Sequence, residues 1–229
     1  MNLFDQLLAP PAQETRFYGV VIALVTNNKD PEGLGRVKVQ YPWLSTQDES
    51  HWARVATPMA GKQRGFYYMP EVDDEVLVAF EHGLVEYPYV LGALWNGKDK
   101  PPVDKEGQNA PDVRVIKTTS GHIVRLDDTQ NAEKIEIIDK SGKDMIIIDA
   151  QANTITIQSD KDLTIESKAG ALTLSGKTVE IKSTGGAVKV NSQADLELKA
   201  NGSLKQNGAT AELKANANLT IKGAVVNIN

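Results

Sequence analysis

The sequence predicts an all-β protein with an N-terminal OB-fold barrel and a C-terminal β-helix of octad repeats. Three observations predict this class. Up to Trp95, short segments alternate apolar and polar side chains, which is the period-two pattern of β-strands. Every Trp, Tyr and Phe lies at or before Trp95 and every Pro at or before Pro111, so the composition changes sharply there. In the last third of the chain, an apolar–variable–apolar unit recurs about every eight residues.

The N-terminal segment, residues 1–16, has two interpretations. Leu3, Phe4, Leu7 and Leu8 fall at helical spacing before a pair of prolines. The segment is either an N-terminal tail or a short amphipathic turn that docks onto a partner.

Residues 17–97 are expected to form the barrel. The expected strands are 18–26, 37–41, 52–56, 76–80 and 89–94, separated by turns at 30–35 and 70–74 and by a loop at 61–65. Gly33 and Gly35 are available for positive φ in the first turn. About five strands in about eighty residues suit a small barrel such as the OB-fold.

The remaining chain divides into three parts. Residues 98–112, rich in Pro, Gly and charge, are expected to be a linker. Residues 113–140 are expected to form neck strands, at 113–116, 122–126 and 135–137, and residues 145–148 lead into the repeats. The rod is expected to occupy residues 141–229.

The repeat units are short strands separated by polar corners. They are Leu163/Ile165, Leu172/Leu174, Val179/Ile181, Val188/Val190, Leu196/Leu198, Leu204/Gln206, Ala211/Leu213, Leu219/Ile221 and Val226/Ile228. Such a unit buries its apolar face only when neighbouring units stack on it, which is typical of a solenoid or fibre. Two rods fit the period. One chain can form a β-helix with three octads per coil, or three chains can wind together, each adding one strand per face. The periodicity leaves both open.

The polar residues give no indication of catalysis. The acidic run Asp73–Glu75 lies in a predicted turn, and Asp127 with Asp128 marks a corner where side chains bind the backbone. His122 has no accompanying nucleophile motif, so we expect it to be structural. The chain has no cysteine, which excludes disulfides and thiolate metal sites, and a net charge of −5 disfavours a nucleic-acid partner. The sequence therefore predicts no enzyme, no cofactor and no metal site.

No targeting signal is evident in the sequence. Residues 1–13 contain Asp5 and no Lys or Arg, unlike a secretory signal. The longest apolar run, 20–25, is far too short to cross a membrane. We therefore expect assembly in the cytoplasm without a signal peptide.

Several strings follow one another in a fixed order: GLGRVKV at 33–39, WARVA at 52–56, PEVDDEVLVAF at 70–80 and PYVLGALWN at 88–96. Pro101–Pro102, SGH at 120–122 and LDDT at 126–129 come next. Together, and followed by octads, they resemble the central spike proteins of contractile injection systems. This family includes the baseplate assembly protein V of contractile-tailed phages and the VgrG spikes of type VI secretion.

The resemblance implies a homotrimer whose chains intertwine in a triple-stranded β-helix. Its trimer core would consist of Leu163, Ile165, Leu172, Leu174, Val179, Ile181, Val188, Val190, Leu196, Leu198, Leu204, Leu213, Leu219 and Ile221. The implied function is that of a structural, membrane-puncturing spike at the centre of the baseplate, driven at a target membrane. The implied location is a phage-tail-like contractile particle or secretion apparatus.

Two further partners are implied. Larger members of the family carry a hub domain before the barrel, whereas only about fifteen residues precede it here, so we expect a separate hub protein. Leu3, Phe4, Leu7 and Leu8 are the candidate hub-docking residues. The last residues have no capping sequence, so we expect a PAAR-like tip protein to cover them. The tip interface would be Val225, Val226, Asn227, Ile228 and Asn229.

Two departures from the family argue against a fused lytic enzyme and against an iron site at the end of the rod. The linker is too short for the lysozyme-like domain that some members carry, and none of His51, His82 and His122 lies near the end, where certain phage spikes bind iron. The alternative function is an OB/β-solenoid module that binds polysaccharide or nucleic acid. The strings fit a phage tail, a type VI apparatus and an extracellular particle equally.

Overall fold

The computed structural model describes residues 16–45, 47–102 and 111–228. The chain divides into two units, Met1–Thr164 and Ile165–Asn229. The first unit contains a barrel and a separate antiparallel sheet, and the second contains the later octads.

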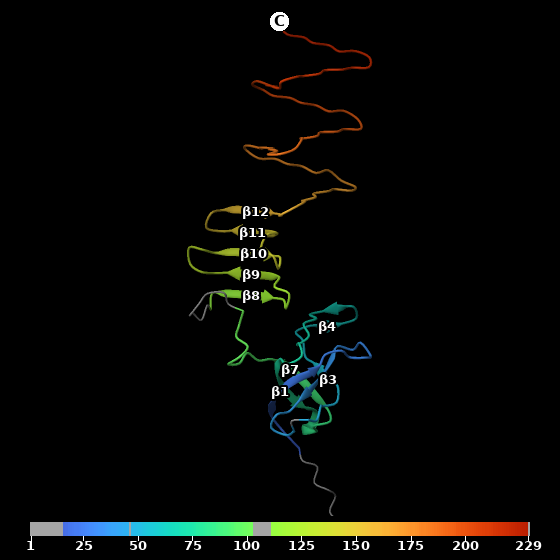
Figure 1. The fold of residues 1–229 in the computed structure, drawn as a ribbon, viewed down its shortest axis with the longest axis vertical. Coiled ribbons are helices and arrows are strands. Elements are labelled where there is room, and N and C mark those ends of the chain that lie inside the picture. The colour runs from blue at the N-terminus through green and yellow to red at the C-terminus, as the bar shows by residue number, and fades with distance from the viewer. Residues whose placement is uncertain (1–15, 46, 103–110, 229) are drawn as a thin grey trace, which may run out of the picture. The chain divides into compact units, whose positions relative to one another are not determined.

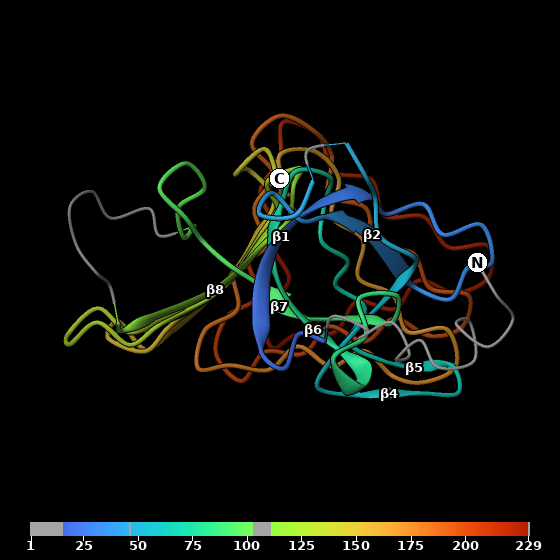
Figure 2. The same cartoon turned by 90° about the horizontal axis from the view of Figure 1, so that it is seen from below.

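The barrel closes through five strands in the order β1-β2-β3-β7-β6 (Figure 1). These strands are β1 (Val20–Asn27), β2 (Arg36–Gln40), β3 (Ala53–Val55), β6 (Glu75–Phe80) and β7 (Pro88–Ala93). β3 and β7 pair in parallel, and the other neighbours pair antiparallel. Figure 2 views the barrel from below, with β1, β2, β6 and β7 labelled around it. Between β3 and β7 along the chain also lie the hairpin strands β4 (Ala60–Gly61) and β5 (Arg64–Gly65), and the 3₁₀ turn η1 (Glu81–Gly83).

Alternate side chains of these strands form the barrel core. In β2 and β6 every second residue is buried, as the period of a strand requires. The buried hydrophobic residues are Ala23, Val25, Val37, Val39, Tyr41, Ala53, Val76, Val78, Phe80 and Val90. The rings of Tyr41 and Phe80 meet edge to face, with centroids 5.5 Å apart. Each fully buried Val contributes at most about 1.5–3 kcal/mol. The barrel therefore has a core of its own.

Asp30 holds the turn between β1 and β2. Its carboxylate accepts hydrogen bonds from Arg36 Nε at 2.9 Å, Arg36 Nη2 at 2.8 Å and the Leu34 amide at 3.0 Å. The Arg36 guanidinium keeps the pKa of Asp30 well below its ordinary value. Gly33 and Gly35 have φ of 67° and 69°, which confirms the positive φ expected at these positions.

The second part of the first unit is an antiparallel meander of five strands, each paired with the next along the chain (Figure 1). The strands are β8 (Val113–Lys117), β9 (Ile123–Asp127), β10 (Lys134–Ile138), β11 (Met145–Asp149) and β12 (Thr154–Gln158). In this register Ile137 stands opposite Val124 on one side and Ile146 on the other. Residues 145–158, which were expected to belong to the rod at 141–229, thus pair within their own chain as strands of this sheet.

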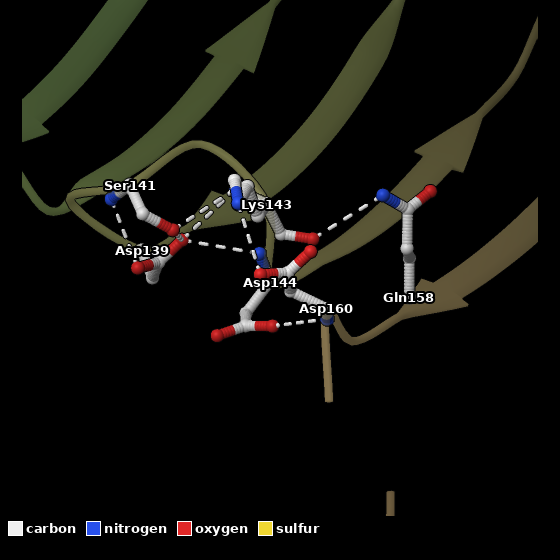
Figure 3. A network of polar contacts seen from close by, with 6 residues as sticks. All are labelled: Asp139, Ser141, Lys143, Asp144, Gln158 and Asp160. Atoms are coloured by element: carbon white, nitrogen blue, oxygen red, sulfur yellow. Dashed lines mark hydrogen bonds and ion pairs between the residues drawn. The ribbon is translucent and has the colours of Figure 1, made fainter. Parts of the chain in front are cut away.

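A polar network fixes the β10–β11 turn and the exit from β12 (Figure 3). The Asp139 carboxylate accepts hydrogen bonds from the amides of Ser141 at 2.9 Å, Lys143 at 3.1 Å and Asp144 at 3.1 Å. These backbone donors, the Ser141 amide above all, keep the pKa of Asp139 below its ordinary value. Asp144 Oδ1 accepts the Asp160 amide at 2.7 Å, and Lys143 Nζ lies 3.0 Å from Asp160 Oδ2. The turn therefore determines where the chain leaves the sheet.

Beyond Gln158, the described residues 159–228 contain no β-strand and form a trace that changes direction repeatedly (Figure 1). Bends fall at 160–161, 168–170, 177, 184–186, 193–194, 201–202, 209–210, 216–217 and 224–225. Each bend begins two to four residues before an apolar pair of the repeat. At three bends a serine hydroxyl donates to a carbonyl three residues further on: Ser159 to Asp162 at 3.2 Å, Ser183 to Gly186 at 2.8 Å, and Ser192 to Asp195 at 3.0 Å. The corners therefore recur with the period of the octads.

The strands of the barrel and of the neck lie within two residues of the expected positions. Residues 61–65, expected as a loop, instead belong largely to the β4–β5 hairpin. β12 was not expected. Across the described ranges, no helix combines the length and the apolarity that crossing a bilayer requires.

Candidate functional site

Three of the polar residues singled out in the sequence, Asp74, Asp127 and His122, close turns, whereas Asp128 pairs with the Arg114 side chain. Asp74 Oδ2 accepts the Glu71 amide at 2.8 Å, and Asp127 Oδ1 accepts the amide two residues further on at 2.9 Å. His122 Nδ1 accepts the Lys140 amide at 3.2 Å, which joins two turns of the sheet. Among the residues that the structure describes, no three His, Cys, Asp or Glu side chains gather as a metal site requires.

One outer face of the barrel brings cations and aromatic rings together. Trp52 lies beneath both Arg36 and Lys38, whose charged groups are 5.8 Å and 5.7 Å from its ring centroid. Arg36 is also paired with Asp30 at 2.8 Å, and Lys38 with Glu49 at 3.1 Å. Both cations are therefore neutralised by carboxylates of the same domain.

Arg54 continues this face. Its guanidinium carbon lies 5.9 Å from the ring centroid of Tyr89, and the Tyr89 hydroxyl donates to Glu81 Oε2 at 2.6 Å. Sequence patterns do not indicate this cluster, because the residues come from separate strands. Its charges are balanced within the barrel, so it lacks the continuous positive potential of a nucleic-acid groove.

A large exposed apolar surface lies on one face of the β8–β12 sheet. Two adjacent rows form it: Leu126, Ile135, Ile148 and Ile155 in one row, and Ile116, Val124, Ile137, Ile146 and Ile157 in the other. We call these residues the isoleucine face. They are 40–71% exposed. A contiguous apolar surface of this kind marks an interaction site, because water is a poor solvent for it.

The opposite face of the same sheet is partly polar. Arg125 and Glu136, directly opposite each other in the register, lie 3.2 Å apart. Lys134 and Asp149 form a second cross-strand pair at 3.2 Å. Ion pairs between neighbouring strands suit a surface that faces water. The isoleucine face is therefore the exposed side of β9–β11, whereas their opposite face is half-buried and combines these ion pairs with apolar residues such as Ile147.

The isoleucine face continues into the repeats. A hollow of about 570 Å³ at one end of the sheet is lined by Ile116, Ile137, Ile157 and Leu163, among others. Leu163 is the first apolar residue of the first octad. The surface that needs covering therefore extends from the sheet to the start of the repeats.

The expected trimer-core residues of the repeats do not come together within one chain. Leu163, Ile165, Leu172, Leu174, Val179, Ile181, Val188, Val190, Leu196, Leu198, Leu204, Leu213, Leu219 and Ile221 are 55–73% exposed. They lie on successive octads separated by bends, and the described residues 159–228 form no core.

The structure describes most of the expected tip interface but none of the expected hub-docking residues. Val225, Val226, Asn227 and Ile228 are exposed at the end of the described chain. Asn229 and the candidate docking residues Leu3, Phe4, Leu7 and Leu8 lie outside the described residues.

Sequence reasoning missed the isoleucine face as a contact surface. The available signal was the Ile-x-Ile spacing at 135 and 137, 146 and 148, and 155 and 157. That spacing predicts strands, but only the pairing register shows that the three pairs share one face.

Comparison with known proteins shows two kinds of similarity. Residues 21–95 match the family described as the type VI secretion system/phage-baseplate injector OB domain. These residues contain all five barrel strands except the first residue of β1.

Relatives extend the similarity beyond the barrel. The chain is 27% identical over 151 residues to the actin cross-linking toxin VgrG1 of Vibrio cholerae, a match that covers 62% of this chain and 13% of that protein. It is 27% identical over 132 residues to the type VI secretion system spike protein VgrG1c of Pseudomonas aeruginosa (56% and 18%). Against the spike protein VgrG5 of the same organism it is 33% identical over 121 residues (51% and 14%). The chain thus matches less than a fifth of the length of each of these relatives.

Proposed function

Since residues 21–95 match an injector OB domain and the chain is a relative of the VgrG spike proteins, we propose that it is the structural spike of a contractile injection system. In this proposal three chains form a homotrimer. Their barrels gather at one end, and residues 159–229 intertwine as a triple-stranded β-helix. The role is mechanical rather than enzymatic.

The observation that carries the proposal is the exposed apolar surface. The isoleucine face and the apolar pairs of the octads are exposed in the single chain. Burying each of these side chains contributes at most about 1.5–3 kcal/mol, so an assembly that covers them together gains a large free energy. The regular bends supply the corners that a triangular rod needs.

The absence of strand pairing in the described residues 159–228 supports three chains over one. A single-chain β-helix would pair each octad with the octad three units further along the same chain. In an intertwined rod the ladder partners belong to other chains, so an isolated chain has corners without strands. Interchain pairing also removes exposed strand edges.

We assign the attachment of the spike to its two ends. Tyr18, Val20 and Ile22 expose apolar side chains at the start of the barrel, directly after residues 1–16, and this supports docking to a separate hub protein. At the other end, Val225, Val226 and Ile228 are exposed, which supports capping by a PAAR-like tip protein. In this proposal the particle assembles in the cytoplasm and meets the target membrane when it fires.

The alternative, a module that binds polysaccharide or nucleic acid, has less support. It would use the Trp52 face of the barrel, where Arg36 and Lys38 are already paired with carboxylates. No aromatic residue follows Trp95, so the rod has no stacking platform.

Co-purification tests the proposed attachments. The full chain, produced together with the hub and tip proteins of its own baseplate, is expected to capture both. Removal of residues 225–229 is expected to release the tip protein alone, and removal of residues 1–12 the hub protein alone, so each truncation controls for the other. Capture of neither partner by the full chain would contradict the proposal.

A further inference from the structure

Symmetry determines which octads are neighbours in a three-chain rod. Each chain places successive octads on successive faces. A three-fold rotation therefore brings octad n+1 of a second chain onto the face that holds octad n of the first. The cross-strand neighbour of every octad is then the next octad of another chain. The strands on one face run parallel, and equivalent positions of consecutive octads stand side by side.

The residue between the two apolar members of each octad points outward, because side chains alternate along a strand. In five consecutive octads this residue is Glu180, Lys189, Glu197, Lys205 and Glu212. The sign of the charge changes at every step. All five residues are exposed in the single chain.

A second outward position, two residues further along each strand, also alternates with a period of two octads. It is occupied by Lys182, Asn191, Lys199, Asn207 and Lys214. No lysine in this series is next to another lysine. Lys214 Nζ lies 3.9 Å from Glu212 Oε1, and both side chains are strongly exposed, which places the two outward positions on the same side of the chain.

We infer, resting on the three-chain rod proposed above, that these residues form an interchain charge ladder whose partner is a second copy of this chain displaced by one octad. With that displacement, Glu180 of one chain stands beside Lys189 of the next, and Lys189 beside Glu197 of the third. A displacement of zero or two octads places like charges side by side, which destabilises a strand pair. Three-fold symmetry already fixes the displacement at one octad, and the charge ladder stabilises the trimer in that register because unlike charges stand side by side at every step.

Charge reversal tests the ladder. The double variant Lys189→Glu, Lys205→Glu makes the five ladder positions uniformly acidic. Its trimer is expected to dissociate at a lower temperature than the wild-type trimer. The difference is expected to shrink between about 0.1 M and about 1 M salt, as the Debye length falls from about 10 Å to about 3 Å.

Two further variants serve as controls. Lys29→Glu with Lys62→Glu makes the same change in net charge at exposed barrel positions and is expected to leave dissociation unchanged. Adding Glu180→Lys, Glu197→Lys and Glu212→Lys to the acidic variant restores the alternation with opposite signs. It is expected to raise the midpoint above that of the acidic variant, but not to the wild-type value, because Lys214 loses its partner Glu212.

Crosslinking tests the register independently, because the chain has no cysteine. Glu197→Cys with Lys205→Cys places thiols on consecutive octads, and a short thiol crosslinker is expected to join different chains. Glu180→Cys with Lys205→Cys places them three octads apart, roughly 14 Å along one face at the spacing of β-strands, and is expected to remain unlinked.

The outcomes separate the two proposals. A wild-type mass of one chain would overturn both the trimer and the ladder. A trimer in which the acidic variant dissociates like the barrel control, or in which only the Glu180/Lys205 cysteine pair crosslinks, would overturn the ladder and leave the spike role standing.

Discussion

The barrel and the octad repeats use the same alternation of apolar and polar residues with opposite results. In the barrel, strands from one chain close on themselves and bury ten side chains, from Ala23 to Val90. In residues 165–228 the alternation is equally regular, yet each described residue is exposed. Alternation therefore predicts strands in both regions. A single chain buries the apolar side of these strands only where the strands that pair with them belong to the same chain.

The β8–β12 sheet is intermediate between these regions. Its backbone pairs within one chain, as in the barrel, while its isoleucine face is exposed, as in the repeats. The exposure of apolar side chains in one chain thus increases along the sequence, and in the proposed trimer the dependence on other chains increases with it. In the proposed trimer, the barrel of each chain folds alone, whereas the repeats form strands only when three chains come together.

The largest expected effect is the loss of the rod by Leu196→Asp. This substitution places a carboxylate in the proposed apolar axis, at a cost of several kcal/mol per chain. Light scattering is expected to show loss of the trimer, while the tryptophan fluorescence of the barrel stays native. Gln193→Asp, at a bend, is the control and is expected to remain trimeric. A trimeric Leu196→Asp variant of wild-type thermal stability would contradict the inward assignment of this row.

A core truncation in the barrel is expected to destabilise the barrel and to leave the rod unchanged. Val78→Ala removes two methyl groups from a fully buried side chain and should lower barrel stability by about 2 kcal/mol. Urea unfolding followed by tryptophan fluorescence measures this loss, with exposed Val72→Ala as the control. The resistance of the rod to SDS should not change. A matching loss of rod stability would show that the two regions are not independent.

Substitutions on the isoleucine face of the sheet are expected to weaken the trimer. Ile146→Thr keeps a β-branched side chain but removes apolar surface, and should weaken the trimer by about 1 kcal/mol per chain. Ile147→Thr makes the same change on the opposite face of β11 and should weaken the trimer less. Thermal dissociation of both variants measures the difference. Equal effects would mean that the isoleucine face is not a contact between chains.

The smallest expected effect concerns pH. The pKa of Asp30 is lowered in the folded barrel by Arg36, so ionised Asp30 stabilises the fold at pH values above its ordinary pKa of about 4. This contribution should be lost as the pH falls below that value. Urea midpoints of the barrel measured between pH 7 and pH 3 are expected to fall more steeply in the wild type than in Asp30→Asn. Parallel curves would contradict the role given to this carboxylate.

Much of the fold could be predicted because alternation and turn residues are local signals. The strands around Val37, Val76 and Val90 and the positive φ of Gly33 and Gly35 follow from neighbouring residues alone. The β4–β5 hairpin was missed because its two-residue strands contain no apolar alternation. It depends on contacts from outside the strands, such as the Thr57 hydroxyl donating to the Phe66 carbonyl at 2.8 Å.

The candidate contact surface was harder to predict. Ile135, Ile146 and Ile157 are far apart in sequence and share a surface only through the register of β10, β11 and β12. In the repeats, the period of eight residues predicts the corners, and the bends of the structure match them. Strand pairing with another chain, as proposed, leaves no local signal beyond the alternating charges of residues 180–212.

The mass of the full chain in solution, measured by light scattering with and without SDS at room temperature, is the most direct test of a rod shared between chains. We predict a mass near three chains that persists in SDS, because no strand of an intertwined rod can detach without disturbing two other chains. A mass of one chain in both conditions would contradict the intertwined rod and would return the octads to a single-chain β-helix.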